Sequence, residues 1–145
     1  MSMDSEFTEE AIAFQSDLNG IDEKKLQGFF VDWPDPPSAQ GHLEILKASH
    51  GIELACDTTT GMVVGFINVI SDGCFCSYIP LLEVLPNYQG SGIARELIRR
   101  IVARYGDLYM LDLCCNEEIA PVYDSHGFQK VCGMARRNYA RQSGT

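Results

Sequence analysis

The segment from Leu81 to Arg100 constrains the fold more than any other part of the sequence. It begins as an apolar run, turns at Pro86-Asn87, passes through Gln89-Gly90-Ser91-Gly92 and continues as an amphipathic helix. Charged residues take one side of that helix, where Glu96 and Arg100 have the spacing of an i,i+4 ion pair. Apolar residues recur on the other side with a 3.6-residue period: Ala94, Leu97, Ile98, Ile101, Val102 and Tyr105. The pattern predicts a strand, a glycine turn and a helix.

A helix that begins directly after a glycine turn offers an anion-binding site. Its first backbone N–H groups have no partner within the helix, and the helix dipole places roughly half a positive charge there. Gly90 and Gly92 keep those amides accessible and tolerate positive φ, and Arg95 adds a charge in the first turn. The alternative is an ordinary strand-to-helix turn. The spacing excludes a Gly-x-x-x-x-Gly-Lys-Ser/Thr loop and, because Arg95 replaces a small residue, a dinucleotide fingerprint.

Length, charge and cysteine pattern limit the class of protein. We expect 145 residues to form one domain, residues 1–145. The net charge of −9 argues against nucleic acid or an anionic membrane as the main partner and favours a cationic amine, although an acidic surface also serves solubility. The six cysteines form no Cys-x-x-Cys and the histidines are scattered, so we expect no metal and buried, reduced thiols in a cytoplasmic protein. The N-terminus lacks the features of a secretion signal, and no apolar run approaches the ~20 residues of a membrane span.

The rest of the chain predicts an α/β fold. Polar residues fill positions 1–9; strands and helices then follow in the order strand from Ile12, helix from Asp22 through Phe30, loop 31–37, helix from Ser38 to His50, strands 52–56, 62–70 and 74–84, the central helix, strand 108–114, helix 117–125 and one or two final strands within 128–139. The unit of strand 74–84, helix and strand 108–114 is a crossover, so its two strands should lie parallel in an otherwise antiparallel, mixed sheet. Strand 108–114 is apolar apart from Asp112 and reads as buried. Ligand should bind at the carboxyl ends of the parallel pair.

Two motifs resemble those of the GNAT superfamily of N-acetyltransferases. The first is Gln/Arg-x-x-Gly-x-Gly/Ala, filled here by Gln89, Gly92 and Ala94 after Val84-Leu85-Pro86. The second places Tyr123 seven residues after Asn116 and Gly127-Phe128 four residues after Tyr123. Both lie in the second half of the chain and in the expected order, whereas the N-terminal part matches only in layout. Ala94 stands where glycine is commoner.

The resemblance implies acetyl-CoA as co-substrate and a primary amine of a small molecule as acceptor. Backbone groups of Val84 and Leu85 would pair with the pantetheine arm, and Asn116 would touch it. Tyr123 would direct its hydroxyl at the CoA sulfur as general acid, and Trp33 would line the acceptor pocket. The pyrophosphate would lie in a cradle made by Gln89, Gly90, Ser91, Gly92, Ile93, Ala94 and, by charge, Arg95.

Direct attack of an amine on a thioester needs a base, an oxyanion donor and a proton for the thiolate. A backbone N–H near Leu85 could polarise the carbonyl. Glu83 ends an apolar strand, where burial would raise its pKa enough for a base, but it could also face solvent or pair structurally. Asp112 and a water relay are the alternatives for the base.

Each of the other candidates also has a structural interpretation. Tyr123 could be a packed aromatic, Asn116 a helix cap, and Trp33 a fastening of its loop to the core. His126 is expected at the surface. Three functions compete: a small-molecule acetyltransferase, a catalytically silent acyl-CoA-binding module and a protein-lysine acetyltransferase. The final strands could also pair across a homodimer.

Overall fold

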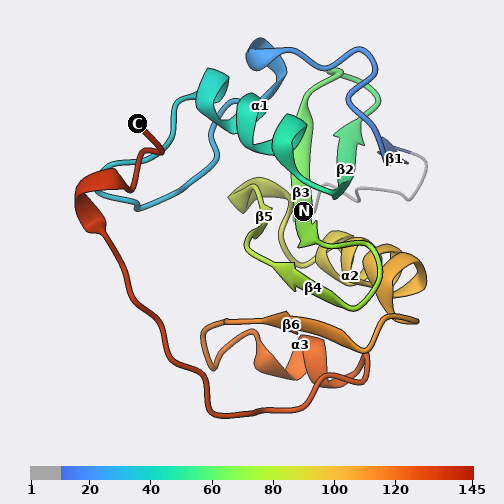
Figure 1. Cartoon of the computed structure of the whole chain (residues 1–145). Helices are drawn as coiled ribbons and strands as arrows, with labels where there is room; N and C mark the ends of the chain where they lie inside the picture. The colour runs from blue at the N-terminus through green and yellow to red at the C-terminus, as the bar shows by residue number, and fades with distance from the viewer. Residues whose placement is uncertain (1–10) are drawn as a thin grey trace.

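A mixed sheet organises residues 11–145, the part of the chain that the computed structural model describes (Figure 1). The prediction for residues 1–9 lies outside the described residues. The strands are β1 (Ile12–Gln15), β2 (Gly51–Asp57), β3 (Val63–Ser71), β4 (Cys76–Ile79), β5 (Leu82–Val84) and β6 (Met110–Leu113). Their order is β1-β2-β3-β4-β6, with β5 also paired to β3; β4 and β6 are parallel and the other pairs antiparallel. The predicted fold class is confirmed.

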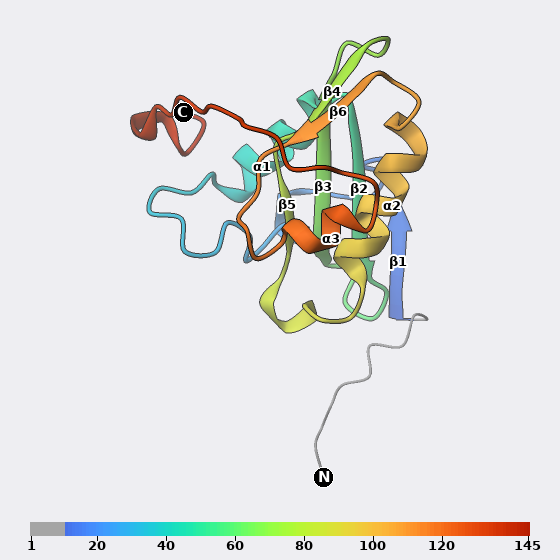
Figure 2. The ribbon, with the colours of Figure 1, turned by 90° about the horizontal axis from the view of Figure 1, so that it is seen from below.

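Helices cover both faces of the sheet (Figures 1 and 2). α1 (Ala39–Ala48) packs over one face, where its apolar side meets β2, β3 and the segment around Phe30. α2 (Ile93–Tyr105) covers the other face with the stripe expected from the sequence, and α3 (Ala120–Asp124) joins the same core through Tyr123. The 3-10 turns are η2 (Glu23–Lys25), η3 (Pro86–Tyr88) and η4 (Tyr139–Arg141).

The helix predicted from Asp22 through Phe30 is much shorter than expected. Asp22 caps η2 by accepting from the Lys24 amide at 3.1 Å, but the turn ends at Lys25. Gly28 has a φ of 88° and Phe30 a φ of 61°, so the backbone leaves the right-handed helical region at both positions. In contrast, the predicted cap of α1 is confirmed, since Ser38 Oγ accepts from the Gly41 amide at 3.0 Å.

The strand predicted over 74–84 is broken at Pro80 into β4 and β5. Ile70 pairs with Tyr78 on β4, whereas Ile67, three residues earlier, pairs with Leu82, four residues later, so one extra residue lies at the break. Proline donates no ladder hydrogen bond, which weakens pairing there. Asn68 bridges the break: its Oδ1 accepts from the Leu81 amide at 3.1 Å and its Nδ2 donates to Ser49 Oγ at 3.0 Å.

Three other predictions for the second half of the chain are wrong in the described residues. β6 is half-exposed rather than buried, because it ends the sheet. Residues 128–138 form no strand, because their backbone groups make no hydrogen bond to any described strand. The cysteines are free, as expected, but only Cys56 is buried; the exposed ones lie in the hairpin turn and around the end of β6: Cys74, Cys114, Cys115 and Cys132.

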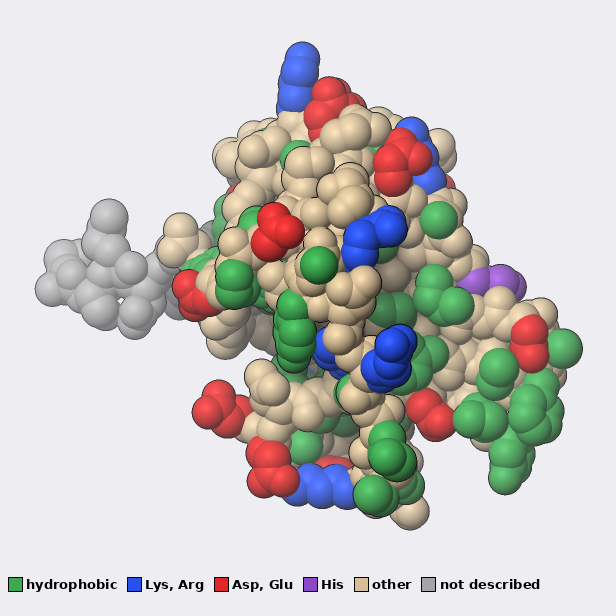
Figure 3. Space-filling view, turned by 60° about the vertical axis from the view of Figure 1, so that its left-hand side comes forward, with side chains coloured by type: hydrophobic (Ala, Val, Ile, Leu, Met, Phe, Trp, Pro, Cys, Tyr) green, Lys and Arg blue, Asp and Glu red, His purple; other side chains and the backbone are tan. Residues whose placement is uncertain are grey.

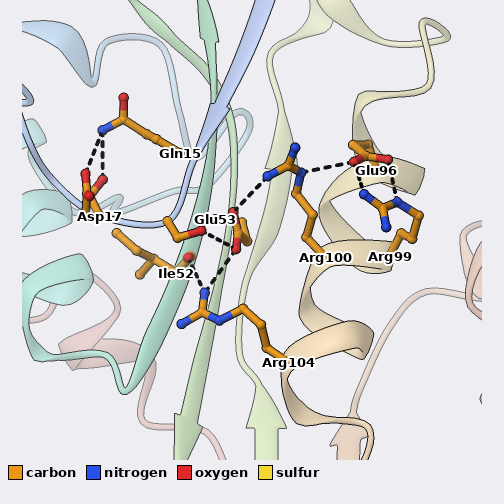
Figure 4. A network of polar contacts seen from close by, with 9 residues as sticks. Gln15, Asp17, Ile52, Glu53, Glu96, Arg99, Arg100 and Arg104 are labelled. Carbon is orange, nitrogen blue, oxygen red and sulfur yellow. Dashed lines mark hydrogen bonds and ion pairs between the residues drawn. The ribbon is translucent and has the colours of Figure 1, made fainter.

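A buried carboxylate attaches α2 to β2 (Figure 4). Glu53 is 2% exposed and its Oε1 accepts from Ser16 Oγ at 2.6 Å and Arg104 Nη1 at 3.0 Å. Arg100 Nη1 lies 3.9 Å from Glu53 Oε2, and its Nε bonds Glu96 at 3.0 Å, so the predicted i,i+4 pair is confirmed and extended. The network therefore fixes which side of α2 faces β2.

Replacing Glu53 by Gln should destabilise the fold by about 2 kcal/mol, because two partly buried arginines lose their counter-charge. Urea unfolding measures the change. Glu44→Gln is the control: Glu44 pairs with Lys47 on the solvent side of α1 at 3.5 Å, and such exposed pairs contribute roughly 0–1 kcal/mol. Equal effects of the two substitutions would contradict a stabilising role for the network.

Candidate active site

The turn before α2 leaves the first amides of the helix uncapped. Gly90 and Gly92 have φ values of 80° and 90°, and no side chain caps α2. A β-carbon at either glycine would meet no atom within 4 Å, so the space in front of the turn is open. Arg95 is exposed in the first turn and makes no ion pair with the described residues. The geometry is that of an anion site.

Two hydrogen bonds hold this turn in place without covering its amides. Tyr88 Oη donates to Asp57 Oδ2 at 2.7 Å, which ties η3 to the turn between β2 and β3 and lowers the pKa of Asp57. Ser91 Oγ donates to the Tyr88 carbonyl at 2.6 Å. The turn is therefore ordered before any ligand arrives.

The outer edge of β5 lies next to this turn, and Val84 rather than Leu85 faces it. The Leu85 amide donates to the Val64 carbonyl at 2.8 Å, so the expected oxyanion donor near Leu85 is already occupied within the sheet. Successive residues of a strand direct their backbone groups to opposite edges, which leaves those of Val84 on the side away from β3. The Val84 carbonyl accepts from Gln89 Nε2 at 3.0 Å.

The two parallel strands separate beside this edge. β4 and β6 pair as far as Ile79 and Leu113; then β5 stays with β3, while the chain after Leu113 turns toward α3. Asn116 lies on that departing segment with its side chain exposed. Ile119, not Asn116, occupies the N-cap position of α3, and no side-chain hydrogen bond caps this helix. Asn116 is therefore not a helix cap.

Tyr123 comes from α3 on the same side of the sheet. It is 5% exposed and packs edge-on against Phe128, with ring centroids 5.4 Å apart. Gly127, with a φ of 90°, makes the turn that returns Phe128 to this ring. Burial, and secondarily the charge that the neighbouring Cys115 carries when it ionises, raises the pKa of Tyr123, so its hydroxyl is a weaker acid than that of an exposed tyrosine.

A pocket of about 300 Å³ opens on the opposite face of β5, around Glu83. Glu83 Oε1 accepts from the Phe30 amide at 2.8 Å and Oε2 from the Val31 amide at 3.3 Å. The carboxylate thus holds the loop that carries Trp33, which also lines the pocket. Glu83 therefore has the structural pairing that was one of its three expected roles, and its carboxylate also lines the pocket. The other lining residues are Val31, Asp32, Phe66, Leu81, Leu82, Pro86 and Gln89.

Known proteins carry the same architecture. Residues 49–130 match the family model of the acetyltransferase (GNAT) domain. The N-alpha-acetyltransferase RimI of Mycobacterium tuberculosis (strain ATCC 25618 / H37Rv) is 31% identical over 149 residues, covering 99% of this chain and 91% of that protein. This chain belongs to the GNAT acetyltransferase family.

Solved structures extend the comparison to the GNAT fold. A candidate acetyltransferase from Deinococcus radiodurans R1 superposes with a TM-score of 0.89 at 38% identity, over 93% of this chain and 94% of that one. An aminoglycoside N-acetyltransferase solved in complex with CoA has a TM-score of 0.60 at 17% identity, over 88% and 93% of the two chains, and shares the fold. The family match makes this chain an acyltransferase of a family that uses acetyl-CoA. No helix in residues 11–145 is long and apolar enough to cross a bilayer.

Sequence reasoning missed several residues of this candidate site. Asp32, with a φ of 65°, brings a second carboxylate to the pocket, and only the folded loop reveals it. Asn68 and Pro80 together separate the strands; the proline was a usable signal, since it interrupts an apolar run. Asp112, the alternative base, is exposed on β6 and is not among the pocket's lining residues.

His42 packs behind the loop that carries Trp33. It is 1% exposed among Phe29, Phe30 and Phe66, and neither ring nitrogen has a hydrogen-bond partner in the described structure. Burial lowers its pKa from 6.5 to about 4. Between these two values the unfolded chain binds a proton that the folded protein excludes.

Stability should therefore rise with pH from about 4 to 6.5, by up to about 1.4 kcal/mol per pH unit from this residue. Urea unfolding at a series of pH values measures the slope. His42→Leu should flatten it, whatever its effect at neutral pH. A slope that survives His42→Leu would assign the pH dependence to other groups.

Proposed function

We propose that this protein transfers the acetyl group of acetyl-CoA to a primary amine by direct attack. The observation that carries the proposal is the uncapped N-terminus of α2, with Gly90 and Gly92 at positive φ and open space in front of them. A diphosphate is the anion that such a row of amides fits, and Arg95 adds charge beside it. Ile93 and Ala94 would contribute the first helical amides.

From this anchor, the pantetheine arm would extend into the space where β5 and β6 separate. The free edge of β5 supports this path, because Val84 can pair with an extended amide chain much as a strand would. Gln89 would release the Val84 carbonyl as the arm enters. Asn116, exposed on the opposite wall, would contact the same arm.

The reacting groups would then meet at the end of β5. The Val84 amide replaces the Leu85 amide as the proposed oxyanion donor, because the latter is bonded to Val64. Glu83 would accept a proton from the attacking amine, whose nitrogen forms a bond to the thioester carbon as the carbon–sulfur bond breaks. Tyr123 would give its proton to the departing thiolate.

A small cationic amine is the acceptor that the pocket favours. The pocket is about 300 Å³, with the Trp33 ring and the carboxylates of Glu83 and Asp32 in its wall. A carboxylate and an aromatic face both attract an ammonium group. A second candidate acceptor is the α-amino group of a peptide, favoured by the relative named N-alpha-acetyltransferase. A thiol-release assay that compares diamines, aminoglycosides and short peptides with free or blocked N-termini separates the two.

Ser91→Asp should weaken acetyl-CoA binding by about 10- to 100-fold, because its carboxylate would stand beside the diphosphate and repel it by about 1–3 kcal/mol. Isothermal titration calorimetry measures the affinity. Ser91→Asn is the matched control, since it also loses the bond to the Tyr88 carbonyl but adds no charge. Equal affinities of the Asp and Asn variants would place the diphosphate elsewhere.

Tyr123→Phe should lower kcat by about 10²- to 10⁴-fold with little change in acetyl-CoA affinity, because only the proton donor is lost from a ring that stays packed on Phe128.

Glu83→Gln should lower kcat/KM while the loop stays in place, since a carboxamide oxygen can still accept from the Phe30 amide. Its deficit should shrink at high pH, where the amine loses its proton unaided. A catalytically silent acyl-CoA-binding module predicts that neither substitution changes thiol release.

A further inference from the structure

A second cavity lies between residues 26–30 and the N-terminus of α1. Its volume is about 130 Å³, and it shares no lining residue with the larger pocket around Glu83. It is lined by residues 26–30, by residues 37–39 and by His42. A volume of this size corresponds to roughly four water molecules in the liquid, so the cavity can hold only a small ligand.

The first two amides of α1 have no hydrogen-bond acceptor in the described structure. Ser38 Oγ accepts from the Gly41 amide at 3.0 Å and the Ser38 carbonyl from the His42 amide at 2.8 Å, so the cap satisfies only the later amides of this turn. The amides of Ala39 and Gln40 precede them, and Ala39 lines the cavity. The positive end of the helix dipole lies at these two donors, which favours a negatively charged ligand.

His42 presents an unpartnered polar side chain to the same cavity. It is 1% exposed, and neither of its ring nitrogens has a hydrogen-bond partner among the residues that the structure describes. A helical side chain leans toward the helix N-terminus, over the residues three and four positions earlier, which here are Ala39 and Ser38. Both line the cavity, as His42 does. Because a buried polar group without a partner is unfavourable, a ligand that accepts a hydrogen bond from this ring would be stabilised there.

The donors and the apolar side chains of the cavity together favour a small carboxylate. Burial lowers the pKa of His42 to about 4, so at neutral pH its ring is uncharged and donates one hydrogen bond. With the two free amides this makes three donors, and an oxyanion is the group that accepts from all of them. Leu26, Phe29 and Phe30 also line the cavity, which suits a short alkyl chain and disfavours phosphate or sulfate. The lining includes no carboxylate of the described chain that would repel the ligand.

The surface around η2 and α1 does not favour a polyanion. In Figure 3, acidic and basic side chains are interspersed over the upper part of the molecule, where Figure 1 places η2 and α1. The chain as a whole carries a net charge of −9, which opposes large anions much more than a singly charged ligand. Selection of the ligand therefore depends on the cavity itself.

We propose that this cavity binds an aliphatic monocarboxylate of about four carbons, with its carboxylate at the Ala39 and Gln40 amides and the His42 ring. The charge of the ligand favours the protonated form of the ring, so affinity should rise as the pH falls below neutral. The ring is packed among three phenylalanines, and no other lining residue within the described structure has a titratable side chain.

Phe30 connects this cavity to the pocket around Glu83. Phe30 lines the cavity, and its amide donates to Glu83 Oε1 at 2.8 Å. A carboxylate that orders residues 26–30 would therefore also order the loop that carries Trp33, and it should lower the KM for the amine. This effect on the KM rests on the proposed function, whereas the binding of the carboxylate does not.

Sodium butyrate is the probe, titrated into the full chain at pH 7 while NMR follows the ring signals of His42. These signals should shift and saturate with a Kd of about 1 mM, a strength expected for so few atoms. 1-Butanol has the alkyl chain without the charge and sulfate has the charge without the chain, so both should bind about tenfold more weakly or worse. The ring signals of His50 and His126, which do not line the cavity, should stay unchanged.

Ala39→Pro removes one of the two free amides and keeps the helix, because proline is accommodated at the first helical position and Ser38 already has an extended backbone. It should weaken butyrate binding about tenfold, whereas Ala39→Ser keeps the amide and should bind as the wild type does. His42→Phe keeps an aromatic ring without its donor and should also weaken binding about tenfold. Circular dichroism verifies that the variants are folded.

Three results would overturn the proposal: no shift of the His42 signals at tens of millimolar butyrate, equal binding of 1-butanol, or full affinity in Ala39→Pro. In the assay of amine acetylation, butyrate should lower the KM of the wild type severalfold and leave that of Ala39→Pro unchanged. An unchanged KM with butyrate bound would refute the connection through Phe30. Absence of amine turnover while butyrate still binds would count against the proposed function and not against this site.

Discussion

The break at Pro80, bridged by Asn68, is the constraint on which the rest of the structure depends. Asn68 is buried, accepts from the Leu81 amide and donates to Ser49, so one side chain satisfies the backbone that the extra residue would leave unpaired. Because one extra residue lies at the break, β5 stays paired with β3 while β4 pairs with β6. The chain therefore separates from β6 after β4. A continuous strand from 74 to 84 would close the space in which we propose that the pantetheine arm lies.

Two glutamates, on strands β2 and β5 that lie on either side of β3, show how the surroundings of a side chain determine its role. Glu53 is sealed between β2 and α2 and meets two arginines and a serine hydroxyl, so its charge is compensated by the fold. Glu83 accepts from the backbone amides of Phe30 and Val31 and lies beside a pocket. The first therefore holds the helix, and the second can hold a loop and still face a substrate.

The two faces of β5 carry different parts of the proposed reaction. Val84 turns its side chain into the α2 core and its backbone to the open edge, next to the uncapped helix. Glu83, one residue earlier, points to the other face, where Trp33 and Asp32 line the pocket. A three-residue strand can thus separate the thioester from the acceptor until they meet at its end, because adjacent side chains of a strand point to opposite faces.

Local chemistry made much of this protein readable from its sequence. Interactions between residues close in the sequence determine the helical period of α2, the glycine turn before it and the caps at Asp22 and Ser38. The crossover to β6 and the family resemblance could also be predicted from the sequence. Three features could not be predicted in this way. They are the length of the first helix, whether the Leu85 amide is free to donate a hydrogen bond, and the exposure of β6. Gly28 and Phe30 adopt left-handed conformations around the amides that Glu83 binds from 53 residues away, and the Leu85 amide is taken by Val64. Residues 128–139 were expected to form one or two strands, but a strand exists only where a second chain segment supplies its hydrogen bonds. Which backbone groups are left without partners is a property of the tertiary structure alone.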